Sequence, residues 1–337
     1  MPTMSLPTVN LLTIRDLNVR FATERGELHA LRDVGLDIGK ERIVGIVGES
    51  GCGKSTLINA ILGLLANNGR IDGGRILFNG RDLTRLDPKS MQALRGIEIA
   101  TVFQDPMGAL NPVISVGRQM RNIQYRSSLR NKEKDARSVA MLQRVRIPDA
   151  KQALHRFPHE FSGGMKQRIA IAMALMMEPA LLIADEPTTA LDATLEVATI
   201  DLLKDLQAGI GCSVLFISHH LGVIAELCDE VVVMYAGEVV ERGSTSQVFN
   251  HPNHPYTARL LECDPARQAK RTRLLPTIPG EIPDLRHRPP GCIFASRCAD
   301  HRSACQAPPP EIEVDNGHFA RCIHARHHDE NSRSRRP

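Results

Sequence analysis

The sequence lacks several features that would place it in particular classes of protein. It has no tryptophan, aromatic residues make up only 4% of its 337 residues, and no apolar run reaches the roughly 18 residues that a membrane-spanning helix needs. Residues 1–10 have neither a charged n-region nor an apolar h-region, so we expect no secretion signal. The formal net charge is only +4, which gives no argument for a nucleic-acid partner. The composition, 42% hydrophobic and 24% charged, is ordinary for a globular protein with a sizeable core.

One stretch, Gly48–Thr56, matches the phosphate-loop pattern G-x-x-x-x-G-K-[ST] without a gap. The apolar run 43–47 before it predicts a buried strand, and residues 56–65 after it predict a helix. In this context the glycines allow backbone N–H groups to surround phosphate oxygens at a positively polarised helix N-terminus. We expect Lys54 to contact the β- and γ-phosphates and the Ser55 hydroxyl to bind Mg²⁺. The expected nucleotide-contacting residues are Gly48, Glu49, Ser50, Gly51, Cys52, Gly53, Lys54, Ser55 and Thr56.

Two adjacent carboxylates follow another apolar run. Residues 180–184 predict a buried strand that ends at Asp185 and Glu186. In phosphate-loop proteins such a strand supplies an acidic partner for Mg²⁺, which is the role we expect for Asp185. Glu186 points elsewhere, and we expect it to polarise a water molecule as a general base. The alternative is a pair of exposed acids that cap a turn.

Three further polar features occur at places where ligands collect in α/β proteins. Gln104 follows the apolar run 97–103 and His219 follows the apolar run 213–217, so both are expected at the carboxyl ends of strands. Ser162–Gly164 stands at a predicted helix start, where backbone N–H groups can bind an anion. Each feature also has a structural alternative: a loop glutamine, a structural histidine, and a serine that caps its own helix.

The chain is expected to contain an α/β domain followed by a loop-rich appendage. Residues 11–37 alternate between apolar and polar positions in places, which predicts antiparallel strands. Residues 113–170 are rich in charge and poor in strand patterns, which predicts a helical insertion. From residue 244 onward prolines cluster and long periodic runs vanish. We therefore expect domains at residues 11–243 and 244–326, between a flexible N-terminus 1–10 and a disordered tail 327–337.

Taken in order, these motifs resemble those of the nucleotide-binding subunits of ATP-binding cassette (ABC) transporters, over roughly residues 11–243. The resemblance implies a P-loop NTPase fold with a RecA-like core, an antiparallel β edge and a helical subdomain. It implies an ATPase that uses ATP and Mg²⁺. It also implies that Phe21 stacks on adenine, that Gln104 senses Mg²⁺ and the permease, and that His219 clamps the γ-phosphate.

By the same resemblance, a second subunit supplies part of each active site. A signature of Ser162, Gly163 and Gly164 contacts the γ-phosphate held by the opposite subunit, and Asp192 lies at the subunit seam. We therefore expect a head-to-tail pair of ATP-binding subunits, the second being a copy of this chain or a paralogue. Two transmembrane permease subunits and an extracytoplasmic substrate-binding protein are the other expected partners. The expected location is the cytoplasmic face of the bacterial inner membrane.

Shorter motifs resemble the oligopeptide, dipeptide and nickel importer branch of the family. They lie at Phe103–Pro106, Ala109–Pro112, Pro158–Glu160, Asn253–Thr257 and Ile278–Pro283. Two residues depart from the wider family: Phe161 replaces a leucine of the signature, and His220 stands where an acid usually follows the clamp histidine. Di- or oligopeptides are the implied substrates, with nickel, opines and glycosides left open. A soluble cassette ATPase without a transport role is the alternative from another class.

Four of the eight cysteines lie close together near the C-terminus, with the spacing C-x5-C-x6-C-x16-C. They are Cys292, Cys298, Cys305 and Cys322. Disulfides are rare in the cytosol, and four thiolates in a segment with little core could hold a metal that orders it. Members of the dipeptide importer branch carry a similar cysteine set, which in some of them binds a [4Fe–4S] cluster. A [4Fe–4S] cluster, zinc and free thiols are all left open.

Overall fold

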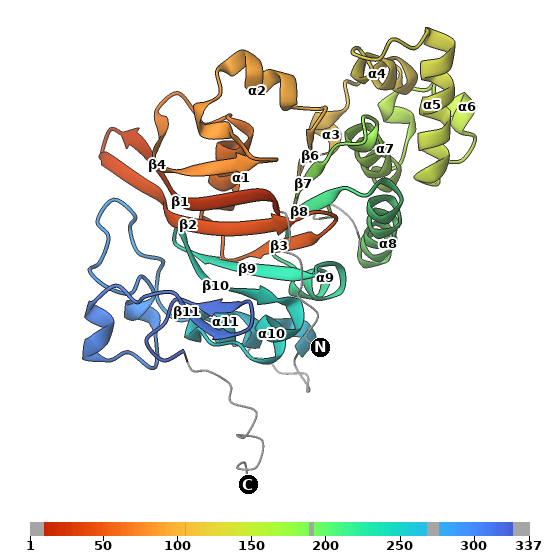
Figure 1. The fold of residues 1–337 in the computed structure, drawn as a ribbon. Helices are drawn as coiled ribbons and strands as arrows, with labels where there is room; N and C mark the ends of the chain where they lie inside the picture. Colours follow the sequence, from red (N-terminus) through yellow and green to blue (C-terminus); the bar gives the residue numbers. More distant parts are fainter. Residues whose placement is uncertain (1–9, 105, 189–191, 268–275, 326–337) are drawn as a thin grey trace, which may run out of the picture. The chain divides into compact units, whose positions relative to one another are not determined.

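The structure, a computed structural model, describes residues 10–104, 106–188, 192–267 and 276–325. The chain divides into two compact units, and both combine helices with strands, as expected for the α/β class (Figure 1). Within the described ranges, unit 1 comprises residues 10–12, 38–43 and 85–218, and unit 2 comprises residues 13–37, 44–84 and 219–325. The sequence predicts a flexible N-terminus at residues 1–10 and a disordered tail at 327–337. Both lie outside the described part except for Asn10, which is the first residue of a strand.

The N-terminal strands form a four-stranded sheet in the order β2-β1-β4-β5. A two-residue turn joins β1 (Asn10–Thr23) to β2 (Gly26–Gly39), where the sequence predicts edge strands. Strand β4 (Gly69–Phe78) continues into β5 (Arg81–Asp82), with which it pairs antiparallel. The alternation seen in residues 11–37 therefore belongs to two neighbouring strands.

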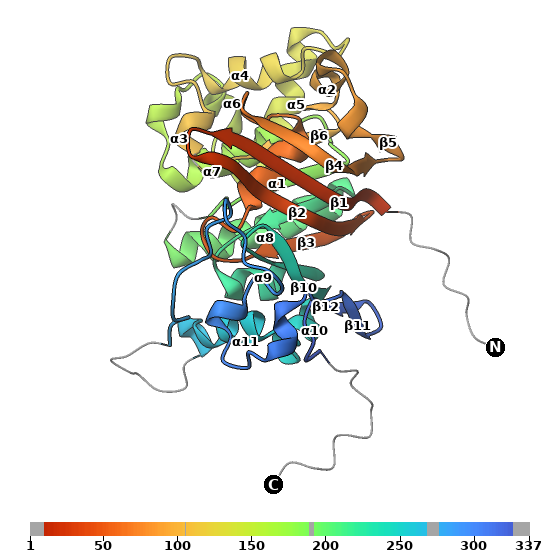
Figure 2. The ribbon, with the colours of Figure 1, turned by 90° about the vertical axis from the view of Figure 1, so that its left-hand side faces the viewer.

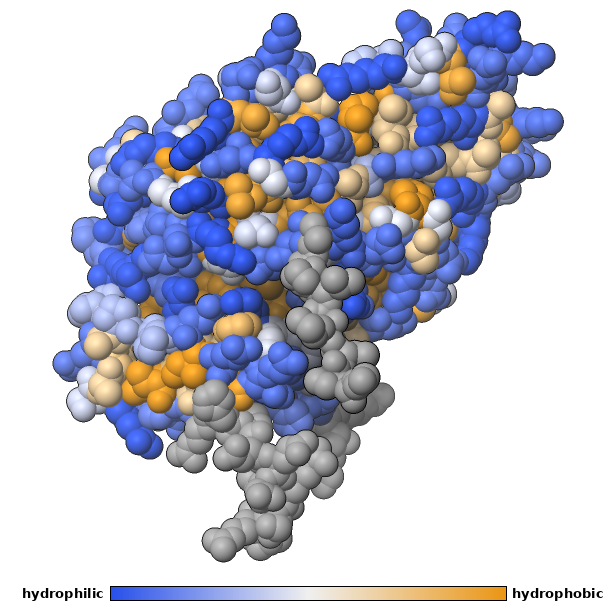
Figure 3. All heavy atoms as spheres, in the orientation of Figure 1, coloured by the Kyte–Doolittle hydropathy of each residue, from blue (hydrophilic) through white to orange (hydrophobic). Residues whose placement is uncertain are grey.

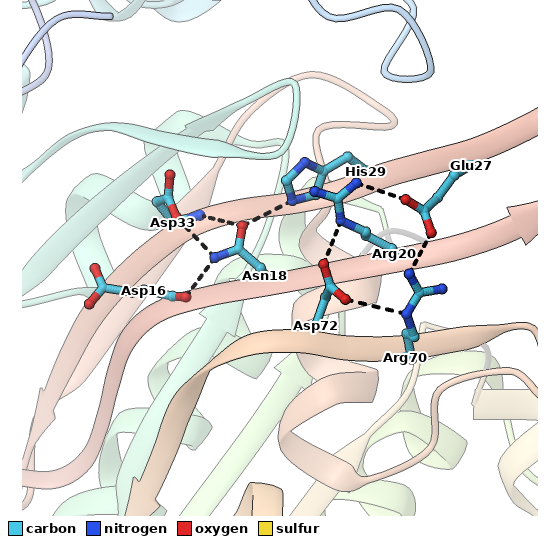
Figure 4. Close-up of polar contacts among 8 residues, drawn as sticks. All are labelled: Asp16, Asn18, Arg20, Glu27, His29, Asp33, Arg70 and Asp72. Carbon is cyan, nitrogen blue, oxygen red and sulfur yellow. Dashed lines mark hydrogen bonds and ion pairs between the residues drawn. The ribbon is translucent and has the colours of Figure 1, made fainter.

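One face of β1, β2 and β4 carries a network of polar side chains (Figure 4). Asn18 donates to Asp33 Oδ1 at 2.9 Å, and its own Oδ1 lies 2.9 Å from His29 Nε2. A second group connects the same strands by ion pairs among Arg20, Glu27, Arg70 and Asp72. Alternate side chains point to the opposite face, where Leu17 and Val19 are fully buried. The alternation of side chains along each strand thus places the charged residues on one face of the sheet and the apolar residues in the core.

A second group of strands in unit 2 includes residues from the C-terminal appendage (Figure 2). Strand β3 (Ile43–Val47) pairs in parallel with β9 (Glu230–Tyr235), and β10 (Glu238–Ser244) pairs antiparallel with β9. Strand β12 (His318–Ala320) pairs with β10, and β11 (Ile312–Asp315) pairs with β12, both antiparallel. The appendage is therefore attached to this sheet by its own strands, which the sequence analysis missed because they are very short.

The remaining elements of unit 2 are short helices. They are α1 (Lys54–Leu62), η1 (Leu83–Arg85, shared with unit 1), α9 (Leu221–Leu227), α10 (Thr245–Asn250), α11 (Pro255–Glu262), η3 (Pro265–Arg267), η4 (Ala295–Arg297) and η5 (Ser303–Gln306). Helix α1 follows β3 after the glycine-rich stretch, as the sequence predicts.

Unit 1 is built on three parallel strands. Strand β7 (Leu181–Asp185) pairs with β6 (Ile99–Val102) on one side and with β8 (Ser213–Ile217) on the other. Nearly all residues of these strands are buried, which is typical of parallel strands covered on both faces. The carboxyl ends of β6, β7 and β8 consequently lie at the same edge.

Helices make up the rest of unit 1. They are α2 (Pro88–Leu94), α3 (Pro106–Ala109), α4 (Val116–Ile123), α5 (Asn131–Arg144), α6 (Ala150–Ala153), η2 (Pro158–Glu160), α7 (Gly163–Leu175) and α8 (Ala193–Ile210). Residues 113–170 contain helices and no strand, as their sequence predicts, and Figure 1 shows α4, α5 and α6 gathered together.

The surface is predominantly polar on the face drawn in Figure 3, with apolar side chains in small groups. Among the helices in the described ranges, none combines the length and the apolar character needed to cross a membrane.

A buried carboxylate fixes the C-terminal appendage to β10. Glu241 is 1% exposed and accepts hydrogen bonds from the backbone N–H groups of Asn253, at 2.7 Å, and His254, at 2.9 Å. Its Oε1 also lies 2.8 Å from Nε2 of the buried His318. A buried carboxylate is unfavourable unless its oxygens are hydrogen-bonded, so these contacts hold the start of α11 and strand β12 against β10.

Replacing Glu241 with alanine should lower the free energy of unfolding by about 3 kcal/mol or more, because buried donors lose their acceptor. Urea unfolding followed by circular dichroism measures this loss. Glu311→Ala is the matched control, since the Glu311 side chain is 36% exposed and pairs with Arg242 at 3.1 Å. We expect that control to cost about 0–1 kcal/mol. Equal losses in the two variants would contradict the anchoring role of Glu241.

Candidate functional site

The phosphate loop, Gly48–Thr56, connects β3 to α1 through three glycines with positive φ. The φ angles are 154° at Gly48, 79° at Gly51 and 108° at Gly53. A Cβ atom at Gly48 would lie 2.1 Å from the carbonyl oxygen of Met234 in β9. Only glycine therefore fits at position 48, because both the backbone conformation and the neighbouring strand exclude a side chain.

Side chains inside the loop hold its curvature. The Lys54 ammonium donates to the carbonyl oxygens of Gly48, at 2.7 Å, and Glu49, at 3.2 Å. Cys52 is 1% exposed, and burial raises the pKa of its thiol, so the side chain packs as a small neutral group. Ser55 is exposed in the first turn of α1.

Residues far along the chain contact the same loop. Tyr256 accepts a hydrogen bond on its hydroxyl from the Glu49 N–H at 2.9 Å. The Arg297 guanidinium binds both carboxylate oxygens of Glu49, at 2.7 and 3.1 Å. Neither contact is predicted from the sequence. Two sequence features could have drawn attention to these residues. Tyr256 lies within the motif Asn253–Thr257, and Arg297 directly precedes Cys298.

Two further predicted site residues also belong to unit 2. Phe21 is half-buried near the end of β1, and its ring leaves no room for a side chain at Gly69, where a Cβ atom would lie 2.5 Å from Phe21 Cε1. His219 is exposed just after β8. His220 precedes the first residue of α9. The adenine contact of Phe21 and the phosphate contact of His219 stay predictions.

In unit 1, the structure brings Gln104 and Glu186 together at the carboxyl ends of β6 and β7. Asp185 is the last residue of β7, and Glu186 follows it with a φ of 46°, which is uncommon for a residue other than glycine. The Glu186 N–H donates to the carbonyl oxygen of Ile217 at 2.9 Å, which fixes this backbone. Gln104 Nε2 donates to Glu186 Oε2 at 3.1 Å. The carboxamide thus orients the carboxylate.

Helix α7 begins at the predicted signature. Ser162 is its N-cap and accepts a hydrogen bond from the Met165 N–H at 3.3 Å. A Cβ atom at Gly164 would lie 3.2 Å from Leu195 of α8, so α7 and α8 pack closely there. A Cβ atom at Gly163 would meet none of the described residues within 4 Å. Ser162 therefore caps its own helix, as the structural alternative predicted. Packing among the described residues gives no reason for a glycine at position 163.

Asp192 is the N-cap of α8. Its Oδ1 accepts hydrogen bonds from the N–H groups of Thr194, at 3.1 Å, and Leu195, at 3.0 Å. This contact gives Asp192 a structural role in starting the helix. Its predicted place at a subunit seam stays a prediction, and the neighbouring Thr189–Leu191 lies outside the described residues.

The four C-terminal cysteines line one small pocket, together with His254 and His324. They are Cys292, Cys298, Cys305 and Cys322. The Cys292 N–H donates to the Cys305 carbonyl oxygen at 2.9 Å, which joins two of the cysteine-bearing segments. Burial raises the pKa of Cys292 to about 11. Within the described ranges, no three side chains of cysteine, histidine, aspartate or glutamate are arranged as the ligands of a metal ion. The metal predicted at these cysteines therefore stays a prediction.

A strand, a glycine-rich phosphate loop and a helix, within an α/β fold, define a P-loop nucleotide-binding protein. Residues 31–189 match the model of the ABC transporter family, and residues 240–305 match the model of the C-terminal region of oligopeptide/dipeptide transporters. The chain belongs to the ATP-binding subunits of ABC transporters, in the branch that carries this C-terminal region. It is an ABC-type ATPase, as the order of its motifs indicates.

Individual relatives agree with this assignment over nearly the whole chain. The chain is 44% identical over 315 residues to the dipeptide transport ATP-binding protein DppD of Bacillus subtilis, covering 93% of this chain and 94% of that protein. It is 43% identical over 318 residues to the oligopeptide transport ATP-binding protein OppD of Salmonella typhimurium, covering 94% of each.

Solved structures show the same fold. One is a dimeric post-hydrolysis state of an ATP-binding cassette bound to ADP and Pi, with a TM-score of 0.62 and 26% identity over 69% of this chain and 98% of that chain. Another is a part of the ABC transporter complex cbiONQ from Clostridium perfringens, with a TM-score of 0.63 and 31% identity over 72% of this chain and 91% of that chain. The predicted P-loop NTPase fold is confirmed.

Proposed function

We propose that this chain hydrolyses ATP to drive the import of di- or oligopeptides through a membrane ABC transporter. The observation that carries the proposal is the presence in one chain of the ABC transporter region and the oligopeptide/dipeptide transporter C-terminal region. The named relatives DppD and OppD, which are similar over more than nine-tenths of the chain, support peptides as the substrate class.

The side chains at the strand ends suit hydrolysis of a γ-phosphate. Glu186, oriented by Gln104, accepts a proton from the attacking water as a general base. Lys54 supplies positive charge to the transferring phosphoryl group, and His219 supplies a hydrogen bond to it. In unit 2 the Ser55 hydroxyl is an oxygen ligand of the kind that Mg²⁺ prefers, and in unit 1 the Asp185 carboxylate and the Gln104 carboxamide are ligands of the same kind. When bound, Mg²⁺ neutralises the charge that develops on the phosphate oxygens.

A second ATP-binding subunit completes each site in this proposal. Gly163 supports this reading, because no atom of the described residues lies within 4 Å of a Cβ atom built there, so packing among them does not require a glycine. In the proposed pair, a neighbouring subunit holds a nucleotide whose γ-phosphate lies close to the backbone N–H groups at the start of α7. Such a close approach leaves no room for a side chain and so requires a glycine. The neighbouring subunit is a copy of this chain or a paralogue. The dimeric cassette with a similar fold is consistent with such a pair.

Exposed apolar side chains in unit 1 support docking to membrane permeases. Phe103 is 51% exposed, Val113 79% and Tyr125 63%, and Leu129 and Phe157 are exposed as well. Exposed large apolar side chains of this kind are candidates for contact with a protein partner. Two permeases, with a substrate-binding protein on the other side of the membrane, would then place this chain at the cytoplasmic face of the inner membrane.

Replacing Glu186 with glutamine should retain ATP binding and lower the hydrolysis rate by about 10²-fold or more, because the general base is lost. Phosphate release and equilibrium binding of a fluorescent ATP analogue measure the two properties. Asp205→Asn is a control, since it removes an exposed carboxylate that pairs with Arg146 elsewhere in unit 1. Near-normal turnover of Glu186→Gln would remove Glu186 from the role of general base.

Purification of the tagged chain from membranes of its native host tests the transport role. We expect two polytopic permeases, a sister ATPase and a peptide-binding protein to co-purify under gentle solubilisation. Ligand screening of that binding protein would distinguish peptides from nickel, opines or glycosides. Recovery of ribosomal or DNA-associated partners without a permease would instead favour a soluble ATPase.

The convergence of four cysteines on one pocket supports a metal or cluster in the C-terminal segment. We expect about four iron atoms per chain for a [4Fe–4S] cluster, or about one zinc atom, in protein purified without oxygen. Elemental analysis with visible absorption spectroscopy distinguishes them, and Cys305→Ser should remove the signal. Protein that holds neither iron nor zinc has free thiols, and the metal proposal is then wrong.

A further inference from the structure

Arg297 is almost completely enclosed although it lies in the loop-rich appendage. Its side chain is 4% exposed. Besides its two bonds to Glu49, it donates from Nε to the Pro279 carbonyl oxygen at 2.9 Å and from Nη2 to the Ile278 carbonyl oxygen at 3.0 Å. It also donates from Nη1 to the Tyr235 hydroxyl at 3.2 Å. The five N–H donors of a guanidinium are thus all used, which fixes its position in the fold.

The residues that surround Arg297 have no assigned role in the proposed hydrolysis of ATP. Gly280 has a φ of +81°, and a Cβ atom there would lie 3.2 Å from Arg297 Cγ, so the segment lies directly against the arginine stem. Aromatic rings of Tyr235, Tyr256 and Phe294 pack against one another beside it, with ring centroids 4.6 to 5.4 Å apart. These rings exclude water from a charged contact and so strengthen it.

The partner of Arg297 belongs to the loop that receives the nucleotide phosphates in the proposed function. A carboxylate at this position has a charge of the same sign as ATP, and like charges at close range disfavour binding. A guanidinium that binds both carboxylate oxygens neutralises that charge and holds the carboxylate in one position. The Tyr256 hydroxyl, which accepts the Glu49 N–H, fixes the backbone of the same residue.

We propose that Arg297 is a positioning residue for ATP binding: by neutralising and holding Glu49, it couples the order of the C-terminal segment to the shape and charge of the phosphate loop. The inference rests on the proposed function, since it requires ATP to bind at Gly48–Thr56. It gives the C-terminal segment a regulatory role, because any change that displaces η4 withdraws the guanidinium from Glu49.

Equilibrium ATP binding to the full chain tests the inference. Arg297→Met should weaken ATP binding about tenfold or more, because it leaves the Glu49 carboxylate unpaired beside the phosphates. Adding Glu49→Gln to Arg297→Met removes that charge and should restore the dissociation constant to within about threefold of the original. The defect should appear in KM for ATP and leave kcat largely unchanged, since bound ATP faces the same catalytic groups.

Arg242→Met is the matched control, since it breaks another bidentate pair to the appendage, with Glu311, that does not involve the loop. Its ATP affinity should be unchanged. Thermal melts check that each variant folds. Wild-type affinity in Arg297→Met, or no recovery in the double variant, would overturn the inference.

Lys54→Ala separates this inference from the proposed function. If Lys54→Ala abolishes ATP binding while Arg297→Met has no effect, the positioning role of Arg297 is wrong and the ATP site stands. If the original chain binds no ATP, or Lys54→Ala binds it as well as the original chain does, the proposed site itself is wrong.

Discussion

The phosphate loop depends on contacts made by residues more than two hundred positions later in the chain. The Glu49 backbone is bound by Tyr256, 207 residues away, and its side chain by Arg297, 248 residues away. A glycine-rich loop has many accessible conformations, so fixing it carries a large entropic cost. Contacts inside the loop, such as Lys54 with Gly48, supply part of the compensation. The contacts from Tyr256 and Arg297 add to it, so the C-terminal segment helps to hold the phosphate loop.

The appendage can act on the loop only because it is itself fixed to the sheet. Glu241 holds the start of α11 and strand β12 on β10, and β10 pairs with β9, the strand that passes directly beside Gly48. The chain of contacts from the appendage through β10 and β9 to the loop therefore runs through strand pairs and buried hydrogen bonds, both of which resist deformation. These contacts give the C-terminal appendage a defined position, although its sequence has few periodic apolar residues.

Short sequence patterns predicted the elements whose structure is determined by residues near to one another in the chain. The strand–loop–helix around Lys54, the buried strand at 213–217 and the absence of strands from 113–170 follow from apolar periodicity and from glycine placement. The pairing of Gln104 with Glu186 was foreseeable in outline, because both follow parallel strands and must lie at one edge. Strands β11 and β12 were missed because three or four residues carry too little periodicity, and the Arg297 contact because no local pattern encodes a partner 248 residues away.

The central claim is that ATP hydrolysis by this chain powers peptide import, and uptake into sealed vesicles tests it most directly. The native complex would be reconstituted with ATP on the side of this chain and a labelled peptide with its binding protein on the other. The account predicts ATP-dependent accumulation of peptide that is lost in the complex with Glu186→Gln although its subunits remain assembled. Accumulation that persists with Glu186→Gln, or ATP hydrolysis that no peptide stimulates and that moves none, would contradict it.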